Sequence, residues 1–199
     1  KEYFLNFKAM TSDFSLHLGD KKEIKILNDH QPLGWNITFA ETGEESETGR
    51  RVMLCEKYVQ TDEFMVTYGD GVADINIGEL VKFHVQHGKI ATVTGVRPPG
   101  RFGAMSIEGD AVMEFNEKMD AGGGLINGGF LVFKKPFFKI LRRFGNTPME
   151  MEPMNELVNQ KQLQVFSHAG FWEPMDTLRE YNKLNKLWSD GPAPWKVWD

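Results

Sequence analysis

The sequence has 199 residues, of which 41% are hydrophobic and 26% are charged, and its net charge is −5. This length suffices for one α/β domain with a buried core, and no stretch approaches the roughly 18 consecutive apolar residues of a membrane-spanning helix. Basic residues occur in short pairs rather than in a stripe, which argues against nucleic-acid binding. The single cysteine, Cys55, excludes an internal disulfide, and the first residues carry no secretory signal, so we expect a cytoplasmic protein that binds no membrane.

Alternating apolar and polar residues predict strands in the first part of the chain. Residues 14–18 and 23–27 flank Gly19 and Asp20, a pattern typical of an antiparallel hairpin. Residues 35–39 predict a third strand, and the polar run that follows predicts a surface loop. A short helix is expected at residues 51–58.

The middle of the chain predicts a strand–helix–strand unit. The apolar run 64–68 stops at Gly69-Asp70-Gly71, which suits a buried strand that ends in a turn. Asp74 is the expected N-cap of a helix that ends at Gly88, and residues 90–96 form the next strand. This series is typical of a crossover in a largely parallel sheet.

The last part of the chain continues the alternation of strands and helices, without a repeat or a clear linker. We therefore expect a single domain over residues 1–199. The elements expected here are strands at residues 112–116, 126–133 and 163–167, and helices at 136–144, 150–160 and 176–189.

Asp70, in Tyr68-Gly69-Asp70-Gly71, is the sharpest local signal for chemistry. Ligands of open α/β sheets lie beyond the carboxyl ends of the strands, and flanking glycines let a ligand approach the backbone closely. Mg²⁺ uses one or two carboxylates together with substrate phosphates, so Asp70 is a candidate metal ligand. The alternative is a turn aspartate that bonds its own backbone, since Asp-Gly is a common turn pair.

Asp176 is the second candidate carboxylate. An aspartate just before an amphipathic helix is favoured as the N-cap of that helix on local pattern alone. A second metal ligand is the alternative, and one residue can hold both roles. His84 and His87 lie three residues apart on an expected helix, but no third ligand stands out, so a zinc site is disfavoured.

Three other segments give weaker signals, and a structural role is favoured for each. Residues 98–103 can present backbone N–H groups to a ligand, because they are rich in proline and glycine. Asn127 begins a glycine interruption of an apolar strand, which indicates a bulge or a close backbone approach. Glu117 and Lys118 end a strand and can line one pocket only if the chain turns between them.

Taken together, six blocks in order resemble the glucose-1-phosphate cytidylyltransferases, a subfamily of the sugar-1-phosphate nucleotidyltransferases. The resemblance covers effectively the whole chain, including its unusual C-terminal tail. The blocks are YGDGVADIN from Tyr68, PPGRFGA from Pro98, FNEK from Phe115, INGGF from Ile126, GFWEPMDTLR from Gly170 and APWKVW from Ala193.

The resemblance implies a Rossmann-like mixed, mostly parallel sheet and the reaction of CTP with α-D-glucose 1-phosphate to CDP-glucose and pyrophosphate. It also implies Mg²⁺ as the cofactor, a homo-oligomer, and a role in supplying deoxysugars of bacterial surface polysaccharide such as O antigen. The catalytic residues at matching positions would be Asp70 and Asp176, which would hold Mg²⁺, and Lys118, which would pair with the sugar phosphate. The sugar pocket would include Gly103, Glu117, Asn127 and Trp172, and Arg51 would lie near the nucleotide.

The sequence departs from the family pattern in ways that leave alternatives open. The glycine-rich loop that grips the triphosphate has no counterpart, so we expect a truncated chain that lacks the first strand and helix of the sheet and is inactive or nearly so. An exposed sheet edge would then favour association. UTP or dTTP in place of CTP, or a non-catalytic homologue that binds sugar nucleotide, are the alternative functions. The other departures are Met119 after Glu117-Lys118, Arg50 in place of a small residue, and Met149 in place of a tryptophan.

Overall fold

The structure is a computed structural model that describes residues 1–19, 22–28, 34–97, 104–108, 111–116 and 124–198. It divides into two compact units, Lys1–Glu41 and Thr42–Asp199, and each is described by itself. The predictions for Gly103, Glu117 and Lys118 fall outside the described residues. The single domain over residues 1–199 stays a prediction.

The first unit contains two short helices and one hairpin. Helices α1 (Glu2–Leu5) and α2 (Phe7–Thr11) precede strands β1 (Phe14–Leu18) and β2 (Lys22–Ile26), which pair antiparallel. The predicted hairpin is confirmed. The strand predicted at residues 35–39 is wrong, because these residues form no ladder with any described strand, and alternation alone does not supply a partner.

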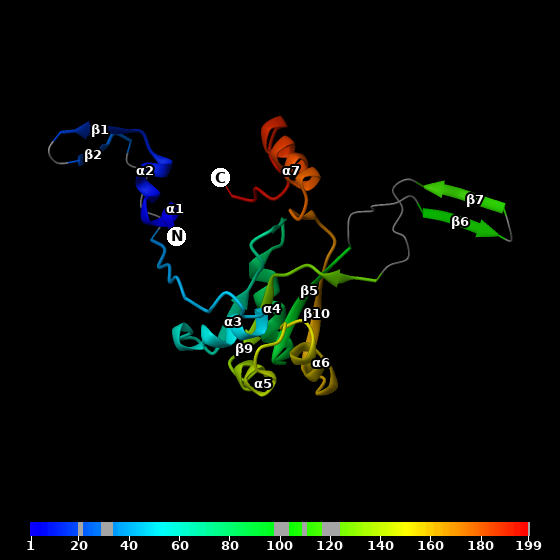
Figure 1. The fold of residues 1–199 in the computed structure, drawn as a ribbon. Coiled ribbons are helices and arrows are strands. Elements are labelled where there is room, and N and C mark those ends of the chain that lie inside the picture. Colours follow the sequence, from blue (N-terminus) through cyan, green and yellow to red (C-terminus); the bar gives the residue numbers. More distant parts are fainter. Residues whose placement is uncertain (20–21, 29–33, 98–103, 109–110, 117–123, 199) are drawn as a thin grey trace. The chain divides into compact units, whose positions relative to one another are not determined.

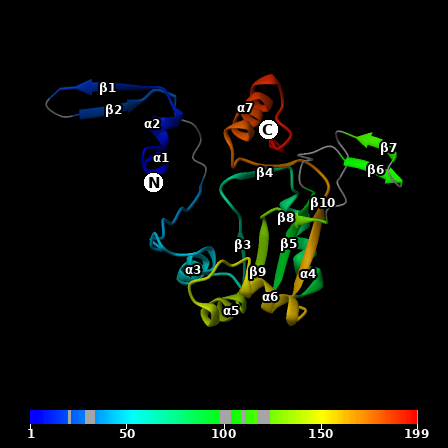
Figure 2. The ribbon, with the colours of Figure 1, turned by 45° about the vertical axis from the view of Figure 1, so that its right-hand side comes forward.

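The second unit is built on a mixed sheet (Figure 1). Figure 2 shows the strands side by side, and their order is β10 (Leu163–His168), β5 (Ala91–Val96), β9 (Leu131–Lys134) and β3 (Glu63–Val66), with β8 (Ile126–Asn127) also paired to β5. The ladder between β5 and β10 is parallel, whereas β9 is antiparallel to both β3 and β5. The α/β class and the mixed sheet are confirmed. The description "mostly parallel" holds for the common direction of β3, β5 and β10, but only one ladder among the described strands of this sheet is parallel.

The predicted crossover is confirmed, and β9 lies inside it. β3, helix α4 (Ile77–His87) and β5 come in the expected order, with β4 between β3 and α4, and β9 lies between β3 and β5 in the sheet. Leu131, Val132 and Phe133 of β9 are all essentially inaccessible to solvent. A strand that is apolar on both faces takes an interior place in a sheet, which is why β9 separates β3 from β5.

Helices cover both faces of this sheet. Val132 of β9 packs with Leu80 of α4, whereas Leu131 and Phe133 pack with α5 (Phe137–Phe144) and α6 (Glu152–Asn159). This division follows from the alternation of side chains along a strand. The remaining elements are α3 (Thr48–Leu54), η1 (Glu56–Tyr58), β4 (Gly71–Ala73), the hairpin of β6 (Ala104–Glu108) and β7 (Ala111–Asn116), β11 (Trp172–Pro174) and α7 (Leu178–Asp190).

Helix boundaries confirm some predicted signals and correct one. Gly88 ends α4 with φ of 68°, and Gly145 follows α5, as predicted. The N-cap of α4 is Asn76, whose side chain accepts a hydrogen bond from the backbone N–H of the third residue beyond it. The predicted cap Asp74 is wrong, because the buried Ile75 belongs to the core and the helix starts only after it. None of the helices in the described ranges is both long and apolar enough to cross a membrane.

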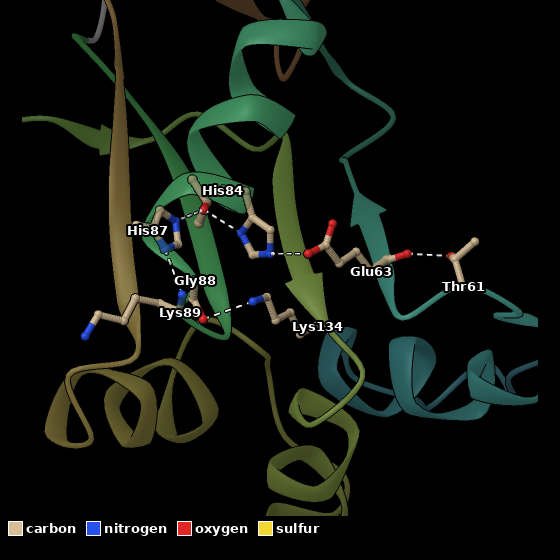
Figure 3. Close-up of polar contacts among 8 residues, drawn as sticks. Thr61, Glu63, His84, His87, Gly88, Lys89 and Lys134 are labelled. Carbon is tan, nitrogen blue, oxygen red and sulfur yellow. Dashed lines mark hydrogen bonds and ion pairs between the residues drawn. The ribbon is translucent and has the colours of Figure 1, made fainter.

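A chain of hydrogen bonds joins α4 to β5 and points toward β3 (Figure 3). The Lys89 backbone N–H donates to Nδ1 of His87 at 2.9 Å, so a neutral His87 carries its proton on Nε2, 2.7 Å from the Thr92 hydroxyl oxygen. The same hydroxyl oxygen lies 2.7 Å from Nδ1 of the buried His84, to which it can donate its own proton. Nε2 of His84 faces a Glu63 carboxylate oxygen at 3.9 Å. The hydrogen bond from Lys89 therefore requires a neutral His87 imidazole, and the Thr92 hydroxyl can donate to a neutral His84.

We expect the free energy of unfolding to fall as the pH is lowered from 6.5, the ordinary histidine pKa. Burial lowers the pKa of both His84 and His87, and the positive charge of Lys134 adds to this, whereas Glu63 opposes it at His84. A lowered pKa in the folded state means that the unfolded chain takes up protons first. Stability is thus present above pH 6.5 and is lost as the pH falls through the folded-state pKa.

Urea denaturation at a series of pH values measures this dependence. The variants His84→Gln and His87→Gln should flatten it, and His17→Gln, a change at an exposed position on β1, should not. An unchanged pH dependence in both of the first two variants would contradict the assignment.

Candidate active site

A short antiparallel ribbon carries the two predicted metal ligands. Strands β4 and β11 pair over three residues, in the register Gly71–Pro174, Val72–Glu173 and Ala73–Trp172. Asp70 directly precedes β4, and Asp176 lies two residues beyond β11. The backbone N–H of Met175 donates to the carbonyl oxygen of Asp70 at 2.7 Å. The ribbon therefore brings Asp70 and Asp176, which are far apart in sequence, to the same end of one small element.

Asp176 is not the cap of α7. Thr177 holds that position: its hydroxyl accepts a hydrogen bond from the Glu180 N–H at 3.3 Å, and the Glu180 carboxylate accepts one from the Thr177 N–H at 2.9 Å. Asp176 contributes only its backbone N–H, which also donates to Glu180. The N-cap interpretation of Asp176 is thus wrong. Its exposed carboxylate forms no hydrogen bond with any residue in the described ranges, so both oxygens are available to a cation.

The donor set at this end of the ribbon suits Mg²⁺. Asp70 and Asp176 are both exposed and offer the hard oxygen ligands that Mg²⁺ takes together with substrate phosphates. The alternative for Asp70, a side chain bonded to its own backbone, finds no such hydrogen bond in the described part of the chain. No group of three or more His, Cys, Asp or Glu side chains lies together among the described residues. The pair therefore fits a cation that substrate phosphates help to hold.

Asn127 is held by a hydrogen-bond network at the end of β3. Its Nδ2 donates to the Tyr68 hydroxyl at 3.0 Å, and its Oδ1 accepts from the Gly129 N–H at 3.0 Å. The Tyr68 hydroxyl in turn donates to a Glu150 carboxylate oxygen at 2.5 Å. Burial, followed by the hydrogen bond and charge of Glu150, raises the pKa of Tyr68 well above its ordinary value. The hydroxyl therefore stays protonated, and Asn127 keeps one N–H and one lone pair for a ligand.

Tyr68 and Glu150 were not singled out by the sequence analysis. Tyr68 directly precedes the Gly-Asp-Gly turn, so its position next to Asp70 was a usable signal. Glu150 carried no such signal, because it lies 82 residues from Tyr68 and only the fold brings the two together.

Trp172 contacts the same region through its indole. Its Nε1–H donates to the carbonyl oxygen of Gly128 at 2.9 Å, and the side chain is half-buried. Since this is the only hydrogen-bond donor of the indole, Trp172 can offer a ligand its ring but no hydrogen bond. The bond also ties β11 to the turn after Asn127, so the ribbon and the Asn127 segment form one connected region.

Replacing Gly128 by alanine is expected to destabilise the protein by about 1–3 kcal/mol, through overpacking of a buried position. A Cβ at Gly128 would lie 2.5 Å from Cγ1 of the buried Val96. Urea denaturation measures the effect, and the neighbouring Asn127 should bind a ligand more weakly because it is displaced. Gly124→Ala is the matched control, since a Cβ there meets no atom within 4 Å. A Gly128→Ala protein as stable as the control would contradict this packing argument.

Arg51 lies on α3 and anchors the loop that precedes it. Its guanidinium donates to the Thr42 hydroxyl at 3.1 Å and to the Glu44 carbonyl oxygen at 2.9 Å, and its further N–H groups remain for an anion. Thr48, at the start of α3, donates to Glu150 at 2.7 Å, which links this helix to the Tyr68 network. A cavity of about 350 Å³ lies beside Arg51. It is lined by Arg51, Val52, Cys55, Val59, Phe64, Met65, Val66, Thr67 and Phe138.

Two of the departures from the family pattern are described by the structure. Arg50 is exposed on α3, whereas its neighbour Gly49 is buried, and a Cβ at Gly49 would lie 2.6 Å from the Thr147 carbonyl oxygen. Met149 fills a core position with 1% exposure. The small residue that the backbone requires at this point is therefore Gly49, and Arg50 displaces nothing from the core.

Comparison with known proteins decides the family. The model of the nucleotidyl transferase family matches residues 10–190. The chain belongs to this family. A glucose-1-phosphate cytidylyltransferase of Salmonella typhi is 43% identical to this nucleotidyl transferase over 200 residues, which cover 100% of the chain and 77% of the relative. A probable glucose-1-phosphate cytidylyltransferase of Bacillus subtilis is 38% identical over 198 residues, with 100% and 76% covered.

A solved structure supports the fold of this nucleotidyl transferase. It is a putative glucose-1-phosphate thymidylyltransferase from Bacillus anthracis in complex with a sucrose, with a TM-score of 0.58 and 21% identity. The match covers 77% of this chain and 65% of the solved chain. At this identity the likeness supports the α/β nucleotidyltransferase fold and nothing about the substrate. The substrate class rests on the relatives of higher identity.

Proposed function

We propose that this chain transfers a cytidylyl group from CTP to α-D-glucose 1-phosphate, giving CDP-glucose and pyrophosphate. The observation that carries the proposal is the β4–β11 ribbon, which places Asp70 and Asp176 at one end, in a chain 43% identical to a glucose-1-phosphate cytidylyltransferase. Nucleotidyl transfer needs no protein nucleophile. It needs reactants in line and groups that neutralise phosphate charge.

The reaction forms one bond and breaks one. An oxygen of the sugar phosphate attacks the α-phosphorus of CTP, and the bond from that phosphorus to pyrophosphate breaks. Mg²⁺ held by Asp70 and Asp176 would neutralise the charge that develops on the phosphates. Lys118 would pair with the phosphate of the sugar, as the family resemblance implies. The carboxylates and the lysine thus orient two anionic substrates that would otherwise repel each other.

The remaining candidates would hold the sugar and the nucleotide. Asn127 has one N–H and one lone pair free beyond the Tyr68 network, which suits a sugar hydroxyl. Trp172 would contact the sugar with its ring. Arg51 would contribute its unused N–H groups near the nucleotide. The sugar-binding roles of Glu117 and of the Gly103 backbone rest on the resemblance alone.

Several finer points stay predictions. They are the identity of the metal as Mg²⁺, the homo-oligomeric state, the cytoplasmic location and the supply of deoxysugars for O antigen. The absence of nucleic-acid and membrane partners also stays a prediction.

The test is pyrophosphate release from glucose 1-phosphate with CTP, UTP, dTTP and ATP in parallel, with the product identified by mass spectrometry. We expect CDP-glucose, and release with CTP at least about tenfold faster than with the other nucleotides. Faster release with UTP or dTTP would show that the proposed nucleotide, CTP, is wrong. Binding of CDP-glucose without any release would fit both a non-catalytic sugar-nucleotide-binding protein and the inactivity expected without the glycine-rich loop, and the same assay with that loop supplied separates the two.

A further inference from the structure

The β4–β11 ribbon is too short to hold its own geometry. It pairs only three residues of each strand, and an isolated two-stranded ribbon is marginal in water even when it is longer. At the end that carries the two aspartates, the Met175 N–H closes the ribbon on the Asp70 carbonyl oxygen. At the other end, the Asp74 N–H donates to the Phe171 carbonyl oxygen at 3.2 Å. The positions of Asp70 and Asp176 therefore depend on what fixes this second end.

His168 fixes that end. It is the last residue of β10, where its backbone pairs with Val96 of β5, so it belongs to the central sheet. Its Nε2 lies 3.1 Å from the Phe171 carbonyl oxygen and 2.9 Å from Oδ1 of Asp74. That oxygen is buried and has no hydrogen bond of good geometry within the described residues. A buried carboxylate oxygen is costly unless it is paired, and the imidazole is the group that lies within reach of it.

Gly170 makes this approach possible. A Cβ at Gly170 would lie 2.4 Å from Oδ1 of Asp74 and 2.7 Å from Cε1 of His168. The turn between β10 and β11 thus leaves room for the carboxylate and the imidazole to meet. Any larger residue would push the two apart.

Two other contacts hold the middle of β11. The indole of Trp172 bonds the Gly128 carbonyl oxygen, and the Lys183 ammonium of α7 lies 2.6 Å from the nearly buried carboxylate of Glu173. Neither of these two polar contacts involves a side chain of β4. Ala73 of β4 packs against the apolar cluster that includes Val132 of β9 and Phe166 of β10. The contact between His168 and Asp74 adds a polar link from the central sheet to the residue that directly follows β4.

We propose that Asp74 and His168 are a positioning pair, which sets the β4–β11 ribbon on the sheet so that Asp70 and Asp176 together bind the metal–nucleotide complex. This inference rests on the proposed function. In this proposal neither residue of the pair contacts substrate. Groups that orient metal ligands in this indirect way typically change metal affinity about 10- to 100-fold when they are replaced.

The test uses Mn²⁺ as the probe, because its binding in the presence of CDP-glucose is read by electron paramagnetic resonance without turnover. Asp74→Asn and His168→Ala should each weaken Mn²⁺ binding about tenfold or more, and the double variant should be little worse than either one. His168→Gln, which keeps an N–H donor, should recover part of the loss. Hydrogen exchange of the Met175 amide, which closes the ribbon, should also become faster in these variants. The acceleration should be larger in Asp74→Asn and His168→Ala than in His168→Gln.

The matched control is Arg143→Gln, which breaks the ion pair of 2.7 Å between Arg143 of α5 and Glu156 of α6, away from the ribbon. It should leave Mn²⁺ binding unchanged. If His168→Ala fails to fold, the nearly isosteric Asp74→Asn carries the test. Unchanged Mn²⁺ binding in a folded Asp74→Asn protein would overturn the proposal, and so would additive losses in the double variant.

Failure of this inference can be distinguished from failure of the proposed function. Asp70→Asn and Asp176→Asn should abolish Mn²⁺ binding if the ribbon is the metal site. If they do and the Asp74 and His168 variants do not, the positioning pair is wrong and the function stands. If Asp70→Asn and Asp176→Asn bind Mn²⁺ normally, the metal site itself is wrong.

Discussion

Replacing Asp70 or Asp176 by asparagine is expected to lower kcat/KM about 10²- to 10³-fold, the range seen when one group that stabilises transition-state charge is removed. Each substitution keeps the size of the side chain and removes the charge that would hold the cation. Both side chains are exposed, and neither carboxylate has a hydrogen bond within the described residues. The free energy of unfolding should therefore stay within about 0.5 kcal/mol of the original value.

The free energy of unfolding distinguishes a metal-ligand role of Asp176 from the capping role that the local sequence pattern favours. Thr177→Ala should lower the free energy of unfolding by about 1 kcal/mol, because Thr177 and Glu180 form the capping box of α7. Asp176→Asn should not. Parallel urea denaturation and pyrophosphate-release assays on the two variants measure both quantities. If Asp176→Asn is destabilised but fully active, Asp176 acts as a helix cap and not as a metal ligand.

The sequence pointed to Asp70 and Asp176 as candidate metal ligands, a role that stays a prediction, and it indicated little about their surroundings. Asp70 and Asp176 stood in recognisable blocks, and the structure joins those blocks through β4 and β11. The partner of Tyr68, in contrast, is Glu150, at a separation of 82 residues. Local patterns report what a residue does within its own turn or helix. They carry no information about which distant side chain will complete a hydrogen bond.

The same limit explains the error at the start of α4, but not the one at the start of α7. Asp74 and Asn76 are both good capping residues, and only the burial of Ile75 between them decides for Asn76. At α7 the deciding signal was present in the sequence, because Thr177 and Glu180 have the spacing of a capping box. The prediction instead took Asp176, one residue before Thr177, as the N-cap.

Strand order was the part of the fold that local pattern could not supply. The strand–helix–strand series was predicted correctly, and so were the glycines that end α4 and α5. β9 lies between β3 and β5 because β9 itself is apolar on both faces. The glycines after Asn127 were interpreted as a bulge, so residues 126–133 were predicted as one strand. The structure breaks it at Gly129 and Phe130, with φ of 77° and 48°, into β8 and β9.

Replacing Phe133 by alanine is expected to lower the free energy of unfolding by about 3–5 kcal/mol, the largest stability effect that we expect from a single substitution here. Phe133 lies on β9, is fully buried, and stacks on Phe137 of α5 with ring centroids 4.1 Å apart and an interplanar angle of 4°. It also lies 5.6 Å from Phe64 of β3, whose ring stacks on Phe138 at 4.6 Å. The substitution opens a cavity between the sheet and α5 and removes an aromatic pair.

A loss of this size is comparable to much of the total stability of a domain, about 5–15 kcal/mol, so the variant should unfold at far lower urea concentration. Phe14→Ala is the matched control, since Phe14 is also on a strand but is 44% exposed, and it should change stability by less than about 0.5 kcal/mol. The folded fraction of Phe133→Ala should retain its kcat/KM, whereas Asp70→Asn should lose activity while fully folded. If Phe133→Ala unfolds at the same urea concentration as Phe14→Ala, the phenylalanine stack does not hold α5 on the sheet. Phe133→Ala and Asp70→Asn thus distinguish a residue that stabilises the fold from a residue that acts at the end of the β4–β11 ribbon.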